Sequence, residues 1–136
     1  MPIEDDSKIK QILEDAKVIA VVGASTKPWR ESNNIADFLI RKGYNVIPVN
    51  PRYQEVLGRK CYPDVPSIPL KVDIVDVFRN SDSVGEVVDE AIKAGAKTVW
   101  MQLGVINEVA AKKAEAAGVQ VVMDHCIAVE HRRLIR

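Results

Sequence analysis

The stretch Lys17-Val-Ile-Ala-Val-Val-Gly-Ala-Ser-Thr-Lys-Pro-Trp-Arg30 decides the fold of this chain. Residues 18–22 form an uninterrupted apolar run rich in β-branched side chains. Such a run is typical of a strand buried on both faces, as in a parallel sheet. The sequence therefore predicts an α/β protein whose first strand lies inside the sheet.

The turn after this run has the features of an anion-binding turn. Gly23, Ala24 and Ser25 are small and let a ligand approach the backbone closely. A helical pattern begins after Ser32 and Asn33, which we expect to act as helix caps. A strand, a small-residue turn and a helix together place an anion at the helix N-terminus, where N–H groups and the helix dipole attract it.

The turn departs from the dinucleotide fingerprint G-x-G-x-x-G, because Ser25 and Pro28 occupy the second and third glycine positions. One alternative is an ordinary tight turn between strand and helix. We favour a ligand site, because Lys27 and Arg30 share the loop and would attract an anion.

Composition limits the classes of function. The chain has 136 residues, which we expect to form a single domain spanning 1–136. Its 19 basic and 19 acidic side chains give zero formal net charge, so we expect no nucleic-acid partner. We also expect no membrane association and a cytoplasmic protein, because apolar runs are short and residues 1–6 are unlike a secretory signal. In that compartment Cys61 and Cys126 are expected to be free thiols.

Strand and helix patterns alternate along the chain. The predicted strands are 18–22, 45–49, 73–78, 98–101 and 119–123, and the predicted helices are 7–16, 34–42, 83–94, 107–117 and 127–134. A capping box at 83–86 opens the third of these helices. Residues 54–71 read as a connecting loop with room for a short hairpin. This alternation predicts a doubly wound sheet of about five parallel strands flanked by helices.

In such a sheet, ligands bind outside the carboxyl ends of the strands. Four cations follow predicted strands and only two acids do, so this edge is basic although the chain is neutral. The cations are Lys27, Arg30, Arg52 and Arg79, and the acids are Glu31 and Asp124. Solvated surface charges are the alternative interpretation, but their convergence on one edge favours an anionic ligand.

The end of the second strand bears on which nucleotide binds. An NAD site has Asp or Glu there for the ribose hydroxyl, whereas this chain has Asn50, Pro51 and Arg52. A cation at that position would attract a phosphate on the ribose. Two ligands remain open on this reasoning, NADP and coenzyme A.

At this point the chain resembles a known family. The runs VIAVVGAS, KPWRESN, VIPVNPRY, VDIVDVFRN, VWMQLGV and VVMDHC resemble the small single-domain CoA-binding proteins, which are similar to the CoA-binding domain of the succinyl-CoA synthetase α subunit. The resemblance covers about residues 17–134 and implies a Rossmann-like sheet that holds coenzyme A. It is the order and spacing of these runs that is specific, since none of them is unique alone.

The resemblance also implies where each part of coenzyme A lies. The diphosphate would lie at the turn 23–25 with Lys27 and Arg30 nearby, the adenosine with its 3′-phosphate at 50–52 and 78–79, and the pantetheine arm toward 104 and 126. The candidate binding residues are Gly23, Ala24, Ser25, Lys27, Arg30, Ser32, Asn33, Asn50, Pro51, Arg52, Phe78, Arg79, Gly104 and Cys126.

Synthetase activity does not carry over with the resemblance. The synthetase has a second domain with a phosphorylated histidine, and neither His125 nor His131 stands in a comparable sequence setting. The run Asp124-His125-Cys126 holds the residue types of a catalytic triad, but neighbouring residues on an extended segment point to opposite faces. We expect no catalytic residues and no metal site, since Cys126 and His131 supply only two of the four ligands of a structural zinc site.

The remaining aromatic and thiol groups have less specific interpretations. Trp29, Tyr53 and Tyr62 are expected to be surface or packing aromatics, and Cys61 an inert thiol. For Cys126 two interpretations stay open, a mixed disulfide with coenzyme A under oxidising conditions and a small residue packed in the core.

The sequence therefore predicts a non-catalytic coenzyme A-binding, carrier or sensor module. The alternatives are an NADP-dependent oxidoreductase and a regulatory domain that reports ligand state to a protein partner. A homodimer or another protein partner is compatible with the sequence, which contains no patch specific enough to assign one.

Overall fold

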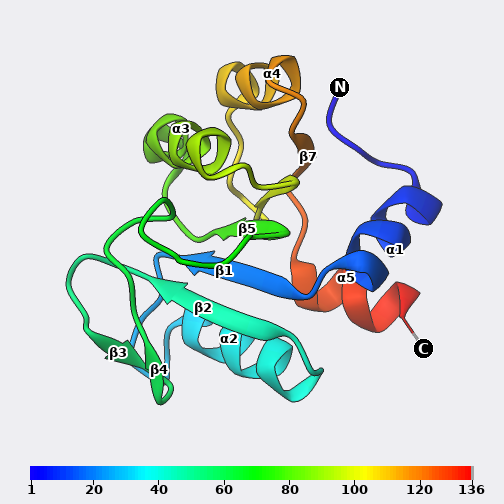
Figure 1. Ribbon diagram of the computed structural model, residues 1–136. Helices are drawn as coiled ribbons and strands as arrows, with labels where there is room; N and C mark the ends of the chain where they lie inside the picture. The colour runs from blue at the N-terminus through cyan, green and yellow to red at the C-terminus, as the bar shows by residue number, and fades with distance from the viewer. Residues whose placement is uncertain (136) are drawn as a thin grey trace.

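The computed structural model describes residues 1–135 and contains a five-stranded parallel sheet flanked by five α-helices (Figure 1). The sheet order is β2-β1-β5-β6-β7, and β3 and β4 form a separate hairpin. The strands are β1 Val18–Val22, β2 Asn45–Val49, β3 Glu55–Val56, β4 Arg59–Lys60, β5 Ile74–Val77, β6 Thr98–Met101 and β7 Gln120–Met123. The helices are α1 Asp6–Asp15, α2 Glu31–Arg41, η1 Ser81–Ser83, α3 Val84–Ala94, α4 Glu108–Ala116 and α5 Ile127–Leu134. The predicted Rossmann-like α/β class is confirmed.

The order of the strands determines where along the sheet a ligand can bind. β1 pairs with β2 on one side and with β5 on the other, both in parallel. The chain leaves β1 toward β2 and then crosses back to β5, so the direction of winding reverses between β1 and β5. Loops diverge at such a reversal and leave a crevice at the carboxyl ends of the strands.

Alternating side chains divide the core into two layers. Ala20 and Val22 of β1 pack in a cluster with α3 and α4, whereas Ile19 and Val21 pack with α1, α2 and α5. Figure 1 shows the same division, with α3 and α4 on one face of the sheet and α2 and α5 on the other. Both faces are covered, which explains why the strand β1 is apolar at every position.

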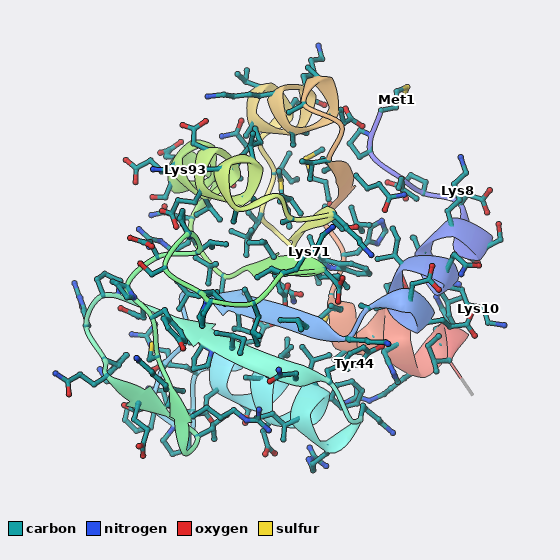
Figure 2. The ribbon with its side chains drawn as sticks, viewed as in Figure 1. Met1, Lys8, Lys10, Tyr44, Lys71 and Lys93 are labelled. Carbon is teal, nitrogen blue, oxygen red and sulfur yellow. The ribbon has the colours of Figure 1, made fainter. Side chains whose placement is uncertain are left out.

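Side chains from two loops hold the segment between α1 and β1 in place. The Tyr44 hydroxyl, labelled in Figure 2, donates a hydrogen bond of 2.6 Å to the Leu13 carbonyl at the end of α1. Asp73 accepts from the backbone N–H groups of Lys17 and Val18 at 2.8 and 2.9 Å. These contacts hold the entry to β1 and leave its carboxyl end free for the crevice.

The start of α2 differs from the prediction. The helix begins at Glu31 with Arg30 as its N-cap, so Ser32 and Asn33 lie in the first turn and are not caps. The Asn33 side chain instead donates to the Ser25 carbonyl at 2.8 Å. Asn33 therefore hydrogen-bonds to the preceding turn, a tertiary contact that cap preferences do not describe.

The predicted capping box at 83–86 is also wrong. The 3₁₀ turn η1 runs directly into α3, and Ser83 has helical backbone angles with no side-chain cap bond. Its hydroxyl donates to the Asn80 side chain at 2.7 Å. Asn107 is the N-cap of α4, since its side chain accepts from the Ala110 N–H at 2.9 Å.

The connecting loop 54–71 contains a short hairpin, which the sequence allowed. β3 and β4 pair antiparallel, with Glu55 opposite Lys60. Within residues 1–135, none of the helices has the length and apolarity that a membrane span requires.

Candidate functional site

A cleft of about 830 Å³ lies along the carboxyl ends of β1, β2, β5 and β6. It occupies the crevice that the strand order predicts. Its lining residues are Gly23, Ala24, Ser25, Lys27, Arg30, Glu31, Ser32, Asn50, Pro51, Arg52, Tyr53, Phe78, Arg79, Asn80, Ser83, Gln102, Leu103 and Val105. The cleft thus brings together eleven of the fourteen candidate binding residues, the others being Asn33, Gly104 and Cys126.

Gly23 makes the turn at the end of β1. Its φ is +90°, a conformation that residues with a Cβ rarely adopt. A Cβ at this position would overlap the backbone carbonyl oxygen of Phe78. The Gly23 N–H donates to the Val49 carbonyl at 3.0 Å, which ties the turn to β2. Glycine is therefore required here by both backbone angle and space.

Two asparagine side chains hold the turn in shape. Asn33 Nδ2 donates to the Ser25 carbonyl, and Asn50 Nδ2 donates to the Ala24 carbonyl, each at 2.8 Å. The Asn50 Oδ1 in turn accepts from the Arg52 N–H at 2.9 Å. Both asparagines hold backbone of the cleft, and only Asn50 lines it.

The cleft is rich in cations. Lys27, Arg30, Arg52 and Arg79 all line it, and none of them has an ion-pair partner among residues 1–135. Glu31, at the start of α2, is the carboxylate among the lining residues. The excess positive charge favours an anionic ligand, although the whole chain is neutral.

Tyr53 lies in the cleft, a position that sequence reasoning missed. Hydrogen bonding to the Ser25 and Thr26 hydroxyls lowers the pKa of Tyr53, and nearby Lys27 and Arg52 add to this effect. The expectation of a surface or packing aromatic was therefore incomplete. The sequence signal that could have placed Tyr53 in the cleft was its position, because it directly follows Arg52 in the loop after β2.

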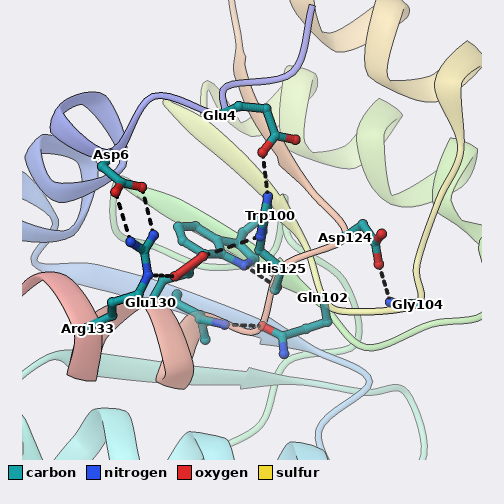
Figure 3. Close-up of polar contacts among 10 residues, drawn as sticks. Glu4, Asp6, Trp100, Gln102, Gly104, Asp124, His125, Glu130 and Arg133 are labelled. Carbon is teal, nitrogen blue, oxygen red and sulfur yellow. Dashed lines mark hydrogen bonds and ion pairs between the residues drawn. The ribbon is translucent and has the colours of Figure 1, made fainter.

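The β6 end of the cleft consists of Gln102, Leu103 and Val105. Gly104 lies between them but does not line the cleft, and its N–H donates to Asp124 Oδ1 at 2.7 Å (Figure 3). Gln102 was not among the fourteen candidate residues, although it is the first polar residue after a predicted strand. Residues at the carboxyl end of a parallel strand are the positional signal that would have found it.

The run 124–126 does not form a triad. His125 contacts the carboxylates of Glu4 and Glu130 at 2.9 and 3.3 Å, and Asp124 bonds to the Gly104 backbone (Figure 3). Cys126 is the N-cap of α5, half-buried and packed against the core layer that contains α5. Cys126 and Cys61 are both free thiols, as predicted.

Asp76 is a buried acid below the carboxyl edge. It lies on β5 opposite Trp100 of β6, is fully buried, and its two carboxyl oxygens have no hydrogen-bond partner among the described residues. Burial raises the pKa of Asp76 well above its usual value, and the charge of Glu31 raises it further. Asp76 is therefore neutral over a wider pH range than an exposed aspartate.

Comparison with known proteins defines the class. Residues 17–132 match the family described as "CoA binding domain", and the chain belongs to this family. The resemblance to the CoA-binding proteins inferred from the sequence is confirmed, and the matching relatives include ADP-forming acetate–CoA ligases.

Individual relatives differ in length and description. The chain is 40% identical over 125 residues to the uncharacterized protein YneT of Bacillus subtilis, covering 92% of this chain and 93% of YneT. A solved structure of a hypothetical protein from Pyrococcus horikoshii OT3 is 48% identical with a TM-score of 0.96, covering 100% of this chain and 97% of that one.

A third relative is a much larger enzyme. The chain is 32% identical to acetate–CoA ligase [ADP-forming] I of Archaeoglobus fulgidus, covering 82% of this chain. The match spans only 18% of the ligase, so most of the ligase has no counterpart in this chain.

Proposed function

We propose that this protein binds coenzyme A, or an acyl derivative of it, in the cleft at the carboxyl edge of the sheet. The observation that carries the proposal is a set of four cleft cations that have no ion-pair partner within residues 1–135, namely Lys27, Arg30, Arg52 and Arg79. Coenzyme A has two separate anionic groups, a diphosphate and a ribose 3′-phosphate. Two of these cations, Lys27 and Arg30, follow β1, and the other two follow β2 and β5.

The diphosphate fits the turn 23–25 and the start of α2. Backbone N–H groups at a helix N-terminus attract phosphate, and Lys27 and Arg30 would add their charges. Ser32 lies in the first turn of α2 and also lines the cleft. The small residues Ala24 and Ser25 leave the backbone open to the phosphate oxygens.

The 3′-phosphate fits the cations at the ends of β2 and β5. Arg52 follows β2 next to Pro51, and Arg79 follows β5 next to Phe78. Phe78 presents an apolar side chain beside the proposed adenosine. NADP also has a ribose phosphate, but family membership favours coenzyme A.

Titration calorimetry with coenzyme A, dephospho-coenzyme A and NADP⁺ tests the proposal. We expect coenzyme A to bind most tightly, with dephospho-coenzyme A weaker because it lacks the 3′-phosphate. Native mass spectrometry of the purified protein provides an independent measurement of a retained ligand. Tighter binding of NADP⁺ than of coenzyme A would overturn the proposal.

We further propose a binding, carrier or sensor role without catalysis, carried by one domain spanning residues 1–136. The polar groups of the cleft wall are mainly amides, hydroxyls and cations, which suit binding. Incubation of the protein with acetyl-CoA, followed by chromatography of the nucleotides, tests the absence of catalysis. Steady conversion of acetyl-CoA beyond one equivalent would contradict it.

A further inference from the structure

Gln102 has an unsatisfied donor at the β6 end of the cleft. Its side chain is only 3% exposed and lines the cleft. Gln102 Oε1 accepts a hydrogen bond of 3.1 Å from the Ile127 N–H at the start of α5 (Figure 3). Gln102 Nε2 is buried and has no partner among residues 1–135. An amide donor that is buried without an acceptor destabilises the unliganded protein. Its presence suggests that a bound ligand supplies the acceptor.

The orientation of this amide is fixed. The Ile127 N–H can only donate, so the carbonyl oxygen of Gln102 must face it and the NH₂ group must face away. The loop before α5 is itself held, because Trp100 Nε1 donates to the His125 carbonyl at 2.8 Å. An amide flip would therefore place two donors against each other and would not remove the unsatisfied group.

The two ends of the cleft differ in charge. The cations stand in the loops after β1, β2 and β5, whereas Gln102, Leu103 and Val105 at the β6 end are uncharged. The phosphates of coenzyme A would therefore occupy the cationic end, and the uncharged pantetheine arm would extend toward β6. Leu103 is 67% exposed at the rim while Gln102 is buried, so Gln102 would meet the tip of the arm.

The tip of coenzyme A has a different hydrogen-bonding capacity in its two forms. Free coenzyme A ends in a thiol, whose sulfur is a weak acceptor. An acyl-CoA ends in a thioester, whose carbonyl oxygen is an acceptor. Asp76 lies on the same face of the neighbouring strand, and its burial raises its pKa and so favours the uncharged form, which would not repel a carbonyl oxygen at this end.

We propose that Gln102 makes this cleft selective for acyl-CoA over free coenzyme A, through donation from Nε2 to the thioester carbonyl oxygen. This inference rests on the proposed coenzyme A function. A neutral hydrogen bond whose donor is already desolvated corresponds to a preference of roughly tenfold.

The test compares coenzyme A, acetyl-CoA and the thioether S-ethyl-CoA by calorimetry. S-ethyl-CoA adds similar bulk without a carbonyl oxygen. We expect wild type to bind acetyl-CoA about tenfold more tightly than the other two. Gln102→Met should lose this preference and bind all three alike. Gln120→Met is the matched control and should keep the preference, because Gln120 lies at the amino end of β7 and bonds to Thr98.

Each contrary result has a distinct meaning. Equal binding of coenzyme A and acetyl-CoA to wild type overturns the selectivity, as does tight binding of S-ethyl-CoA. Equal weakening of all ligands in Gln102→Met also overturns it, because the donor would then serve an amide carbonyl of the arm. Failure of wild type to bind any of them would refute the proposed function itself.

A measurement on wild type covers the case in which Gln102→Met does not fold. The assigned side-chain ¹⁵N–¹H₂ signals of Gln102 can be followed by NMR during titration. We expect them to shift more with acetyl-CoA than with S-ethyl-CoA or coenzyme A, while those of Gln120 stay unchanged. Gln102 signals that move equally with all three ligands, or with none, would refute the inference.

Discussion

Replacement of Gly23 by alanine tests whether the β1 turn is fixed by space as well as by backbone angle. Gly23 has φ +90°, and an added Cβ would overlap the Phe78 carbonyl oxygen while lying 3.0 Å from its carbonyl carbon. Phe78 cannot easily move, because its N–H donates to the Val22 carbonyl at 2.8 Å. Relief of the clash would have to separate β1 from β5 at the edge of the cleft.

The expected cost has two parts. A residue with a Cβ at positive φ costs about 1–2 kcal/mol, and overpacking against a fixed neighbour costs about 1–3 kcal/mol more. Gly23→Ala should therefore lower the free energy of unfolding by roughly 2–5 kcal/mol. Domains have stabilities of about 5–15 kcal/mol, so most of this range leaves a folded protein.

Gly118→Ala is the matched control. Gly118 has φ +83°, but within residues 1–135 no atom beyond its chain neighbours lies within 4 Å of an added Cβ. It follows α4, at the edge of the sheet opposite the cleft, and should show only the cost of the backbone angle. Urea unfolding of wild type and both variants measures the difference, which we expect to be about 1–3 kcal/mol in favour of Gly118→Ala.

Coenzyme A affinity provides a second measurement. Gly23→Ala should weaken binding strongly because it displaces the turn, whereas Gly118→Ala should bind like wild type. Equal destabilisation by the two substitutions would show that the Phe78 carbonyl does not constrain this turn, and the reasoning would fail.

Three further predictions concern the charges of the site and the core. Arg52→Ala should weaken coenzyme A by about 1.5 kcal/mol, the low end for a charged hydrogen bond because Arg52 is exposed, and leave dephospho-coenzyme A unaffected in calorimetry; equal loss for both would reassign Arg52. Ser25→Glu should abolish coenzyme A binding with an unchanged circular dichroism spectrum, and retained affinity would remove the turn from the site. Burial raises the pKa of Asp76. The free energy of unfolding of the wild type should therefore fall by up to about 1.4 kcal/mol per pH unit as the pH rises from the unfolded-state pKa of this group toward its folded-state pKa. Asp76→Asn should lack this slope in urea unfolding at several pH values, and an unchanged slope would show that Asp76 is not its source.

The sequence by itself determined the sheet and its ligand edge. The apolar run 18–22 set the position of the first strand, because a strand covered on both faces is typically apolar along its length. The alternation with helices then required parallel strands, and their carboxyl ends defined where ligands bind. Arg52 and Arg79 could be placed on that edge from chain order alone.

The tertiary structure decided what local patterns do not encode. Asn33 has a good capping side chain, yet it bonds across space to Ser25. Ser83 bonds to Asn80 within a 3₁₀ turn, so its cap signal is not used. The orientation of the Gln102 amide is set by the Ile127 N–H at the start of α5, which donates to Gln102 Oε1 and so turns Nε2 the other way. Local propensity describes a residue with its chain neighbours, whereas each of these roles depends on where the folded backbone leaves a free donor or acceptor.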